Sequence, residues 1–299
     1  MAEIIIQDEA QEIEAALEAR GLWQDALRRL ARNRPAIGGI AVLAIIALLT
    51  LLAPLISPHP FDVIDWDHIG TPPDLAARYF FGTDANGRDL FVRTLYGGRI
   101  SLLVGIVATS VSLAIGVTWG AIAGYAGGMV DGVMMRIVDI LYALPFLFLV
   151  ILLMVMFGRN IVLIFVALGA VEWLNMARIV RGQTLSLKRR EFVEAARAGG
   201  VKPLTIVRRH IIPNLLGPVA VYATLTIPHV ILLESFLSFL GLGVQEPNTS
   251  WGVLISEGAR NMEGAPWALL FPASFLAVTL FCFNFVGDGL RDALDPRDR

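Results

Sequence analysis

Long, nearly uncharged segments recur along this chain of 299 residues. Six of them have the length, about 20 residues, that crosses roughly 30 Å of hydrocarbon as an α-helix. Alternating segments of about ten residues, the pattern of a membrane β-barrel, do not occur. The pattern predicts an all-α membrane protein with six transmembrane helices, at residues 36–56, 100–122, 135–157, 160–178, 214–236 and 267–287.

The composition also favours a membrane protein. Hydrophobic residues make up 56% of the chain and charged residues only 17%, and the mean hydropathy is +0.67. A soluble protein of this length needs a larger charged surface, and disordered, collagen-like and disulfide-rich proteins differ in composition. The single cysteine, Cys282, is expected to be a packed hydrophobic side chain. We expect contact with membrane lipid and none with nucleic acid.

The positions of lysine and arginine predict the orientation. With both termini on one side of the membrane, that side carries 18 of the 24 basic residues. Because the cytoplasmic side of a membrane protein holds the excess of basic residues, both termini are predicted to be cytoplasmic. The start of the chain is acidic and lacks an apolar core, so no cleaved signal peptide is expected.

This orientation assigns the segments outside the predicted helices. Residues 1–35 form a cytoplasmic segment, in which Trp23 and Leu27 at helical spacing favour an amphipathic helix on the membrane surface. An ordinary cytoplasmic helix is the alternative. Residues 57–97 form a periplasmic loop, and residues 289–299 form a cytoplasmic tail.

Several kinds of chemistry are absent from the sequence. A phosphate-binding Walker A loop needs glycine directly before its lysine, whereas Lys188 follows leucine and Lys202 follows valine. The four histidines are too widely spaced for a metal motif, and there is no cysteine cluster. A serine protease site that combines His229 with Ser235 or Ser238 is conceivable, but a hydrogen-bonded His229 is the simpler interpretation. We therefore expect no cofactor and no catalytic residues.

Ionisable residues within the predicted helices need a partner or a wet cavity, because charge in hydrocarbon is costly. Glu234 and His229 are therefore candidates for a substrate path. For Glu234 two alternatives stay open, which are capping by polar groups of a partner subunit and the lining of a cavity. Arg136 and Asp139, three residues apart on one helix, are expected to pair.

The loop at residues 181–214 carries the most informative pattern. A short helix is predicted at residues 192–198, with Glu191 and Glu194 in its first turns, where the helix dipole favours anions. The glycine pair at residues 199–200 ends this helix, because glycine accepts a positive φ.

A second short helix is predicted to start at Pro203 and to stop before Pro213. Two short helices joined at a glycine elbow and flanked by basic residues form a compact unit that suits docking into a groove of another protein. A loop that only connects two transmembrane helices is the alternative.

The motifs in this loop resemble those of a known family. Glu194-Ala195-Ala196 followed by Gly200 and Pro213 is similar to the EAA loop of binding-protein-dependent ABC transporter permeases. His210 and Ile212 depart from the general motif and resemble the peptide-permease branch. Further segments resemble the C subunits of oligopeptide and dipeptide permeases, the oligopeptide branch most closely, at residues 82–89, 96–102, 236–243, 250–252 and 287–296.

The resemblance implies the permease fold of a type I ABC importer, with its transmembrane domain at residues 98–288 and a coupling loop at 181–214. It implies a non-catalytic subunit that imports oligopeptides with a homologous B-type permease, two ATP-binding subunits that bind the ATP, and a periplasmic peptide-binding protein. The residues to which it assigns ATPase coupling are Glu191, Glu194, Ala195, Ala196, Gly200 and Pro213.

Alternatives remain at this point. Relatives of the same branch resemble carriers of dipeptides, nickel or glutathione. A stand-alone proton-coupled transporter would use Glu234 in a proton relay, and a purely structural membrane subunit would have no path. The glycine-rich turn at residues 82–89 is expected either to help dock the binding protein or to be a hydrogen-bonded turn that tucks an elbow helix against the second predicted span.

Overall fold

The computed structural model describes residues 25–158 and 160–294, and this part of the chain is helical with only isolated β-bridges. Its long helices are α2 (Arg34–Ile56), α3 (Leu90–Ala126), α6 (Ile161–Leu187), α9 (Ile212–Phe239) and α11 (Trp267–Leu294). The shorter helices are η1 (Trp66–His68), α4 (Gly128–Tyr142), α5 (Phe146–Phe157), α7 (Glu191–Ala198), α8 (Pro203–Ile206), the π-helix η2 (Val207–Ile211) and α10 (Trp251–Arg260).

Four helical runs of the described chain are long and apolar enough to cross a membrane. They are Arg34–Ile56, Leu90–Ala126, Pro203–Phe239 and Trp267–Leu294. The bent pair α4 and α5 adds a fifth span if the two helices cross together. The count of six spans therefore stays a prediction, whereas the all-α membrane fold agrees with the structure.

The predicted single helix at residues 135–157 is wrong in detail. It is divided between α4 and α5, whose axes differ by 82°. Pro145 occupies the N-cap position of α5. Because proline lacks an amide hydrogen and disfavours helical backbone in the residue before it, the helix ends before Pro145 and restarts in a new direction.

Helix α3 begins earlier than predicted. The Asp89 side chain accepts a hydrogen bond from the Phe91 amide at 2.9 Å and so caps the helix at Leu90. The predicted loop at residues 57–97 therefore ends at residue 89. The tail predicted at residues 289–299 also starts as helix, because α11 continues to Leu294. Residues 1–24, including Trp23 of the predicted amphipathic helix, lie outside the described part.

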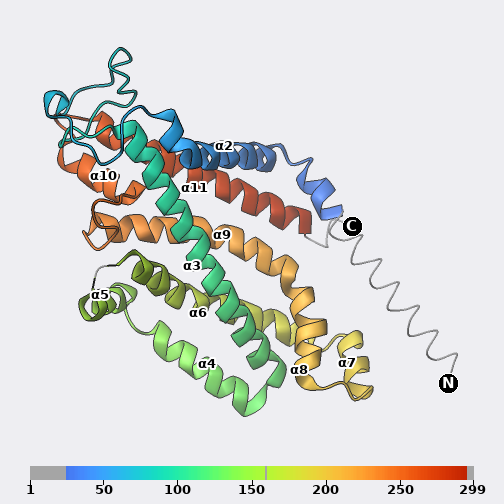
Figure 1. The fold of residues 1–299 in the computed structure, drawn as a ribbon. Helices are drawn as coiled ribbons and strands as arrows, with labels where there is room; N and C mark the ends of the chain where they lie inside the picture. The colour runs from blue at the N-terminus through green and yellow to red at the C-terminus, as the bar shows by residue number, and fades with distance from the viewer. Residues whose placement is uncertain (1–24, 159, 295–299) are drawn as a thin grey trace.

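Helix α3 crosses the molecule (Figure 1). It packs against α6 along a stripe of glycines. Gly116, Gly120 and Gly124 are four residues apart and face α6. A Cβ atom at Gly120 would lie 2.4 Å from the carbonyl oxygen of Ala177, so only glycine allows this approach. Small residues at this spacing are typical of tightly packed transmembrane helices.

Two ion pairs join α6 to α4. Arg181 binds both carboxylate oxygens of Asp131, at 2.6 and 2.7 Å, and Arg178 lies 2.8 Å from Asp139. The expected pairing of Arg136 with Asp139 is therefore wrong, since the guanidinium group of a neighbouring helix reaches Asp139 instead.

The two ends of the bundle differ (Figure 1). The loop at residues 57–89 and α10 lie together at one end, at the left of the view. Helices α7 and α8, the start of α2 and the end of α11 lie toward the other end. Helix α2 runs beside α11.

Candidate functional site

The inner loop unit, which we define as α7, α8 and η2 (residues 191–211), forms a small packed body at the end of α3 and α6. Val193 of α7 is fully buried, as are Ile206 and Ile211. These side chains form one hydrophobic cluster that includes Ala121 of α3 and Val180 of α6. The first predicted short helix is thus present as α7, and the apolar face of the unit is anchored on the membrane helices.

The elbow of the unit depends on Gly200. Its φ is +76°, in the left-handed region that glycine favours. The Gly200 amide donates to the carbonyl of Arg197 at 3.1 Å, and the Val201 amide donates to the carbonyl of Ala196 at 3.1 Å. This pair of bonds is the Schellman motif that closes a helix on glycine. Since no atom lies within 4 Å of a Cβ built there, the requirement for glycine is conformational.

The outward face of the unit carries apolar and acidic side chains. Phe192 is 41% and Leu204 71% exposed. Glu191, Glu194 and Ala195 are exposed as well. Within residues 25–158 and 160–294, neither glutamate has an ion-pair partner within 4 Å. Five of the six predicted coupling residues lie in this unit, and Pro213 follows it in the first turn of α9. All six are exposed except Ala196, which is partly buried.

The expected stop before Pro213 does not occur. Helix α8, η2 and α9 form one continuous run, Pro203–Phe239. Proline lacks an amide hydrogen and clashes with the carbonyl four residues earlier in a regular helix. Pro213 stands in the first turn of α9, directly after the wider π-helical turn, where that clash is relieved. The inner loop unit is therefore continuous with a helix long enough to cross the membrane.

Of the two path candidates, His229 is the open one. Its Nδ1 lies 3.4 Å from Oε1 of Glu172 on α6, and its side chain is 54% exposed while that of Glu172 is buried. The expected hydrogen bond of His229 stays a prediction, whereas its ring lies within ion-pair distance of Glu172 and so links α9 to α6 when it is protonated.

Glu234 is closed off from solvent, with 0% exposure. Its carboxylate accepts hydrogen bonds from Ser238 at 2.6 Å and from Ser101 of α3 at 3.3 Å. Both hydroxyl groups belong to this chain. The structure therefore favours neither expected alternative, because own-chain serines occupy the place of a partner subunit or a cavity.

At the opposite end of the bundle, which the predicted orientation makes the outer end, an ionic cluster joins the turn at residues 82–89 to α10. Arg88 donates to Asp84 at 2.8 Å and to Glu246 at 2.8 Å, and Arg93 donates to Glu257 of α10 at 3.2 Å. Arg93 is only 1% exposed. Burial raises the pKa of Glu257, although the two guanidinium groups oppose that rise. The turn also closes on itself, since the Asp84 amide donates to the Arg88 carbonyl at 3.0 Å.

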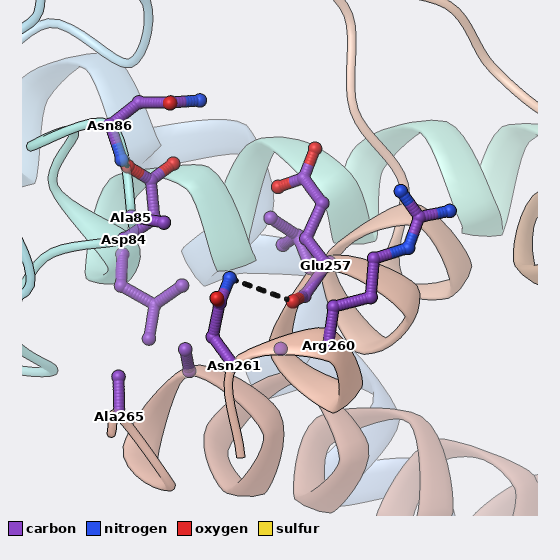
Figure 2. Close-up of a pocket in the computed structure, with 11 residues that line it drawn as sticks. Asp84, Ala85, Asn86, Glu257, Arg260, Asn261 and Ala265 are labelled. Atoms are coloured by element: carbon purple, nitrogen blue, oxygen red, sulfur yellow. Dashed lines mark hydrogen bonds between the residues drawn. The ribbon is translucent and has the colours of Figure 1, made fainter. Parts of the chain in front are cut away.

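A cavity of about 210 Å³ lies between this turn and α10. Figure 2 shows Asp84, Ala85 and Asn86 on one side of it and Glu257 and Asn261 on the other. The Asn261 side chain donates to the carbonyl oxygen of Glu257 at 3.4 Å. In the part of the chain that the structure describes, no cluster of three or more metal-ligating side chains occurs.

The rest of the outer loop is also internally bonded. The Tyr79 hydroxyl donates to Asp65 at 2.7 Å, and His59 stacks on the Tyr79 ring at 4.4 Å. Burial, with help from the Asp65 carboxylate, raises the pKa of Tyr79 to about 12. The Tyr79 hydrogen bond in turn lowers the pKa of Asp65. For the turn at residues 82–89, the hydrogen-bonded alternative agrees with the structure, although α3 and not a separate elbow helix follows it.

Sequence reasoning missed the ionic cluster. Its signal was available, because Arg88 and Arg93 flank the start of a long apolar helix on the side that carries few basic residues. Their partner Glu257 is far away in the sequence, so the contact itself needed the fold.

Comparisons with known proteins agree with this architecture. A family model described as "Binding-protein-dependent transport system inner membrane component" matches residues 116–299, and one described as "N-terminal TM domain of oligopeptide transport permease C" matches residues 21–73. The oligopeptide transport system permease protein OppC of Escherichia coli is 60% identical, over 95% of this chain and 94% of its own length. OppC of Haemophilus influenzae is 58% identical, over 96% and 92%.

More distant proteins agree in fold. The dipeptide transport system permease protein DppC of Bacillus subtilis is 47% identical, over 92% of this chain and 86% of its own length. A chain of the MetNI methionine ABC transporter, solved in inward-facing conformations, has a TM-score of 0.57 and 20% identity and covers 68% of this chain and 96% of its own.

Proposed function

We propose, because the chain belongs to the family of binding-protein-dependent transport system inner membrane components, that it is the C-type permease subunit of an ATP-driven oligopeptide importer. The chain is an integral inner-membrane protein. It is not itself an enzyme in this proposal, and it uses no cofactor, since ATP is bound by partner subunits.

The observation that carries the proposal is the continuity of the inner loop unit with α9. A force applied to the exposed Phe192 and Leu204 surface passes through the buried contacts of Val193 into one unbroken helix. Rigid elements that move together are how displacement at one site reaches another. The unit and the first turn of α9 are therefore the proposed ATPase dock, through Glu191, Glu194, Ala195, Ala196, Gly200 and Pro213.

The rest of the proposed assembly follows from the family and from the predicted orientation, in which both termini are cytoplasmic. Two ATP-binding subunits dock on the inner loop unit, a homologous B-type permease completes the membrane pore, and a periplasmic peptide-binding protein docks on the end formed by residues 57–89 and α10. Both termini are cytoplasmic, and the membrane domain at residues 98–288 contributes five of six spans. His229, with its exposed side chain, is the proposed path-lining residue.

Oligopeptide cargo rests on the names of the relatives at 58–60% identity. The dipeptide permease at 47% identity keeps dipeptides as an alternative cargo, with nickel and glutathione behind it. A stand-alone proton-coupled transporter is a weaker alternative, because Glu234 is sealed by serines and contacts no second carboxylate among the described residues.

The test is co-purification. The full chain is extracted from membranes in mild detergent, and the proteins that accompany it are identified. Two ATP-binding subunits and a second permease are expected. Glu194→Lys should reduce recovery of the ATP-binding subunits, whereas the matched control Glu263→Lys, an exposed glutamate at the opposite end, should not.

Recovery of the chain alone would contradict the proposal. For the proton-coupled alternative, peptide uptake is measured with an uncoupler while ATP is held constant. Uptake that collapses under these conditions would favour the proton-driven transporter.

A further inference from the structure

The serine-bound Glu234 lies where three helices meet. Ser238 is one turn further along α9, and its hydroxyl lies 3.3 Å from that of Ser250. Ser250 is the N-cap of α10 and accepts from the Val253 amide at 3.2 Å. Ser101 of α3, which donates to Glu234, also accepts from the Trp251 amide at 3.2 Å. One carboxyl group thus links α3 and α9 to the first turn of α10.

We propose that Glu234 is a positioning residue that fastens the start of α10 to α3 and α9, so that α10 follows any displacement of α9. The proposal rests on the importer function above, and it assigns to the outer end a mechanical link with the inner loop unit. It gives Glu234 a role other than contact with cargo.

Glu234 is held by hydrogen bonds to serines and, in the described part of the chain, not by an ion pair. Within the described residues no cationic group lies within 4 Å of its carboxylate, and the side chain is 0% exposed. A buried charge without a partner is costly, whereas a buried polar group that is fully hydrogen-bonded is tolerated. An uncharged side chain of the same size and polarity should therefore serve in its place.

The packing around the junction leaves no slack. A Cβ atom at Gly252 of α10 would lie 2.4 Å from the Cα of Ser235 on α9. The fully buried Trp251 donates from its indole nitrogen to the carbonyl of Thr94 on α3 at 2.9 Å. Backbone contacts this close are rigid, because densely packed interiors transmit displacement and do not absorb it.

A second fastening holds the other half of α10. Glu257 binds Arg93 at the start of α3, and Arg88 binds Asp84 in the outer turn. Helix α10 is therefore held at both ends. The inner loop unit, α9, the Glu234 junction, α10 and the outer turn form one connected series across the molecule, which is the kind of contiguous network that couples two distant sites.

The experiment measures whether α10 stays attached to α9. Ser256 of α10 is 6% exposed and its hydroxyl lies 3.4 Å from the Phe239 carbonyl at the end of α9, so Ser256→Cys reports on their separation. The parent is the full chain with Cys282→Ser, in membranes with its partners. The probe is a water-soluble maleimide, and the quantity is the labelling rate of the new cysteine.

Glu234→Ala should raise this rate at least fivefold, and Glu234→Gln should stay within twofold of the parent. Ser101→Ala removes a single hydroxyl and should raise the rate at least twofold. Its matched control is Ser112→Ala, because Ser112 is also a fully buried serine of α3 but has no hydrogen-bond partner among the described residues. The control should label as the parent does.

Two results would overturn the proposal. One is a rate in Glu234→Ala that stays within twofold of the parent, which would mean that α10 is held in place without this carboxyl group. The other is equal labelling of Ser101→Ala and Ser112→Ala, a comparison that remains decisive if Glu234→Ala fails to accumulate. Because labelling does not require cargo or ATP, failure here is distinguishable from loss of the ATP-binding subunits in co-purification, which tests the proposed function.

Discussion

The inner loop unit and the outer unit, which we define as residues 57–89 together with α10, treat their charged groups in opposite ways. In and beside the outer unit, Arg88 and the adjoining Arg93 of α3 are buried and bound to carboxylates of the same chain. In the inner loop unit, Glu191 and Glu194 are exposed, with no ion-pair partner among the described residues. The two arginines of the outer cluster are thus paired within the chain, whereas the two exposed glutamates of the inner loop unit are left for another surface.

This difference predicts two kinds of sensitivity. Removing one member of a buried ion pair leaves an uncompensated charge and destabilises the chain itself. Changing an exposed side chain has little effect on stability but weakens an interface in which it is an anchor. Outer substitutions should therefore lower the stability of the isolated chain, and inner ones should act on assembly and import.

The largest effect on stability is expected for Arg93→Met. The guanidinium group is 1% exposed and binds Glu257 at 3.2 Å, with Asp84 at 3.4 Å. Its loss should lower the free energy of unfolding by about 3 kcal/mol, the cost of breaking a buried pair. Thermal unfolding of the detergent-purified chain measures the loss. The control Arg260→Met changes an exposed arginine of α10, the helix that carries Glu257, and should leave the transition in place.

An unchanged transition in Arg93→Met would show that the buried ion pairs of the outer cluster do not stabilise the chain. It would mean that the outer cluster is replaceable by packing alone, as some buried ion pairs are.

The largest effect on import without loss of the folded chain is expected for Gly200→Asp. A Cβ atom in the left-handed region costs about 1–2 kcal/mol, which distorts the elbow although the site has open space. The chain should remain in the membrane while peptide uptake is abolished. Gly199→Ala is the matched control, because the φ of Gly199 is an ordinary −71°. Normal uptake in Gly200→Asp would contradict the docking role of the elbow.

Much of the fold was predictable because a membrane helix is marked by residues within and directly beside it. The starts at Asn33 and Asn160 carry N-capping side chains, and the long apolar segments after them became α2 and α6. The elbow at Gly200 was predictable for the same reason, since glycine at a helix end is a local signal. Pro145 is a local signal for the break between α4 and α5, but the apolar segment around it is long enough for one helix, so the pattern predicts a single helix.

The parts that sequence reasoning missed depend on distant contacts. Arg93 and Glu257 are paired across the chain, and Asp139 finds Arg178 on another helix in place of the nearby Arg136. The serine cage around Glu234 likewise combines residues of three helices. Spacing along the sequence predicts ion pairs only between neighbouring residues. The folded chain brings distant residues together, and buried charged or polar groups pair with those.

A smaller effect is expected for Leu204→Ser in the inner loop unit. Leu204 is 71% exposed, so its replacement should leave thermal unfolding of the isolated chain unchanged. Because an exposed apolar side chain can anchor an interface, the affinity of the permease for the ATP-binding subunits should fall by about tenfold. Titrating the purified permease with those subunits gives the affinity. If Leu204→Ser lowers the unfolding temperature but leaves the affinity for the ATP-binding subunits unchanged, Leu204 stabilises the chain itself and is not an interface anchor.

The smallest effect is expected for Tyr79→Phe in the outer unit, which removes the hydrogen bond to Asp65 and keeps the ring stacked on His59. Arg78 beside it is exposed, so trypsin cleavage there should become roughly threefold faster at neutral pH. Tyr222→Phe, on α9, should not change that rate. A loop that is cleaved at the parent rate would show that stacking alone orders it.

The pH dependence of this contact sharpens the same prediction. The Tyr79 pKa is raised to about 12, so the contribution of its neutral form is complete below its ordinary value near 10 and is lost as pH rises through 12. The Asp65 pKa is lowered, so its contribution is present above its ordinary value and is lost as pH falls through the lowered one. Ultraviolet titration of the parent minus Tyr79→Phe should show a phenol that ionises near pH 12. An ionisation near pH 10 would mean that the Tyr79 hydroxyl is free in solution and makes no hydrogen bond to Asp65.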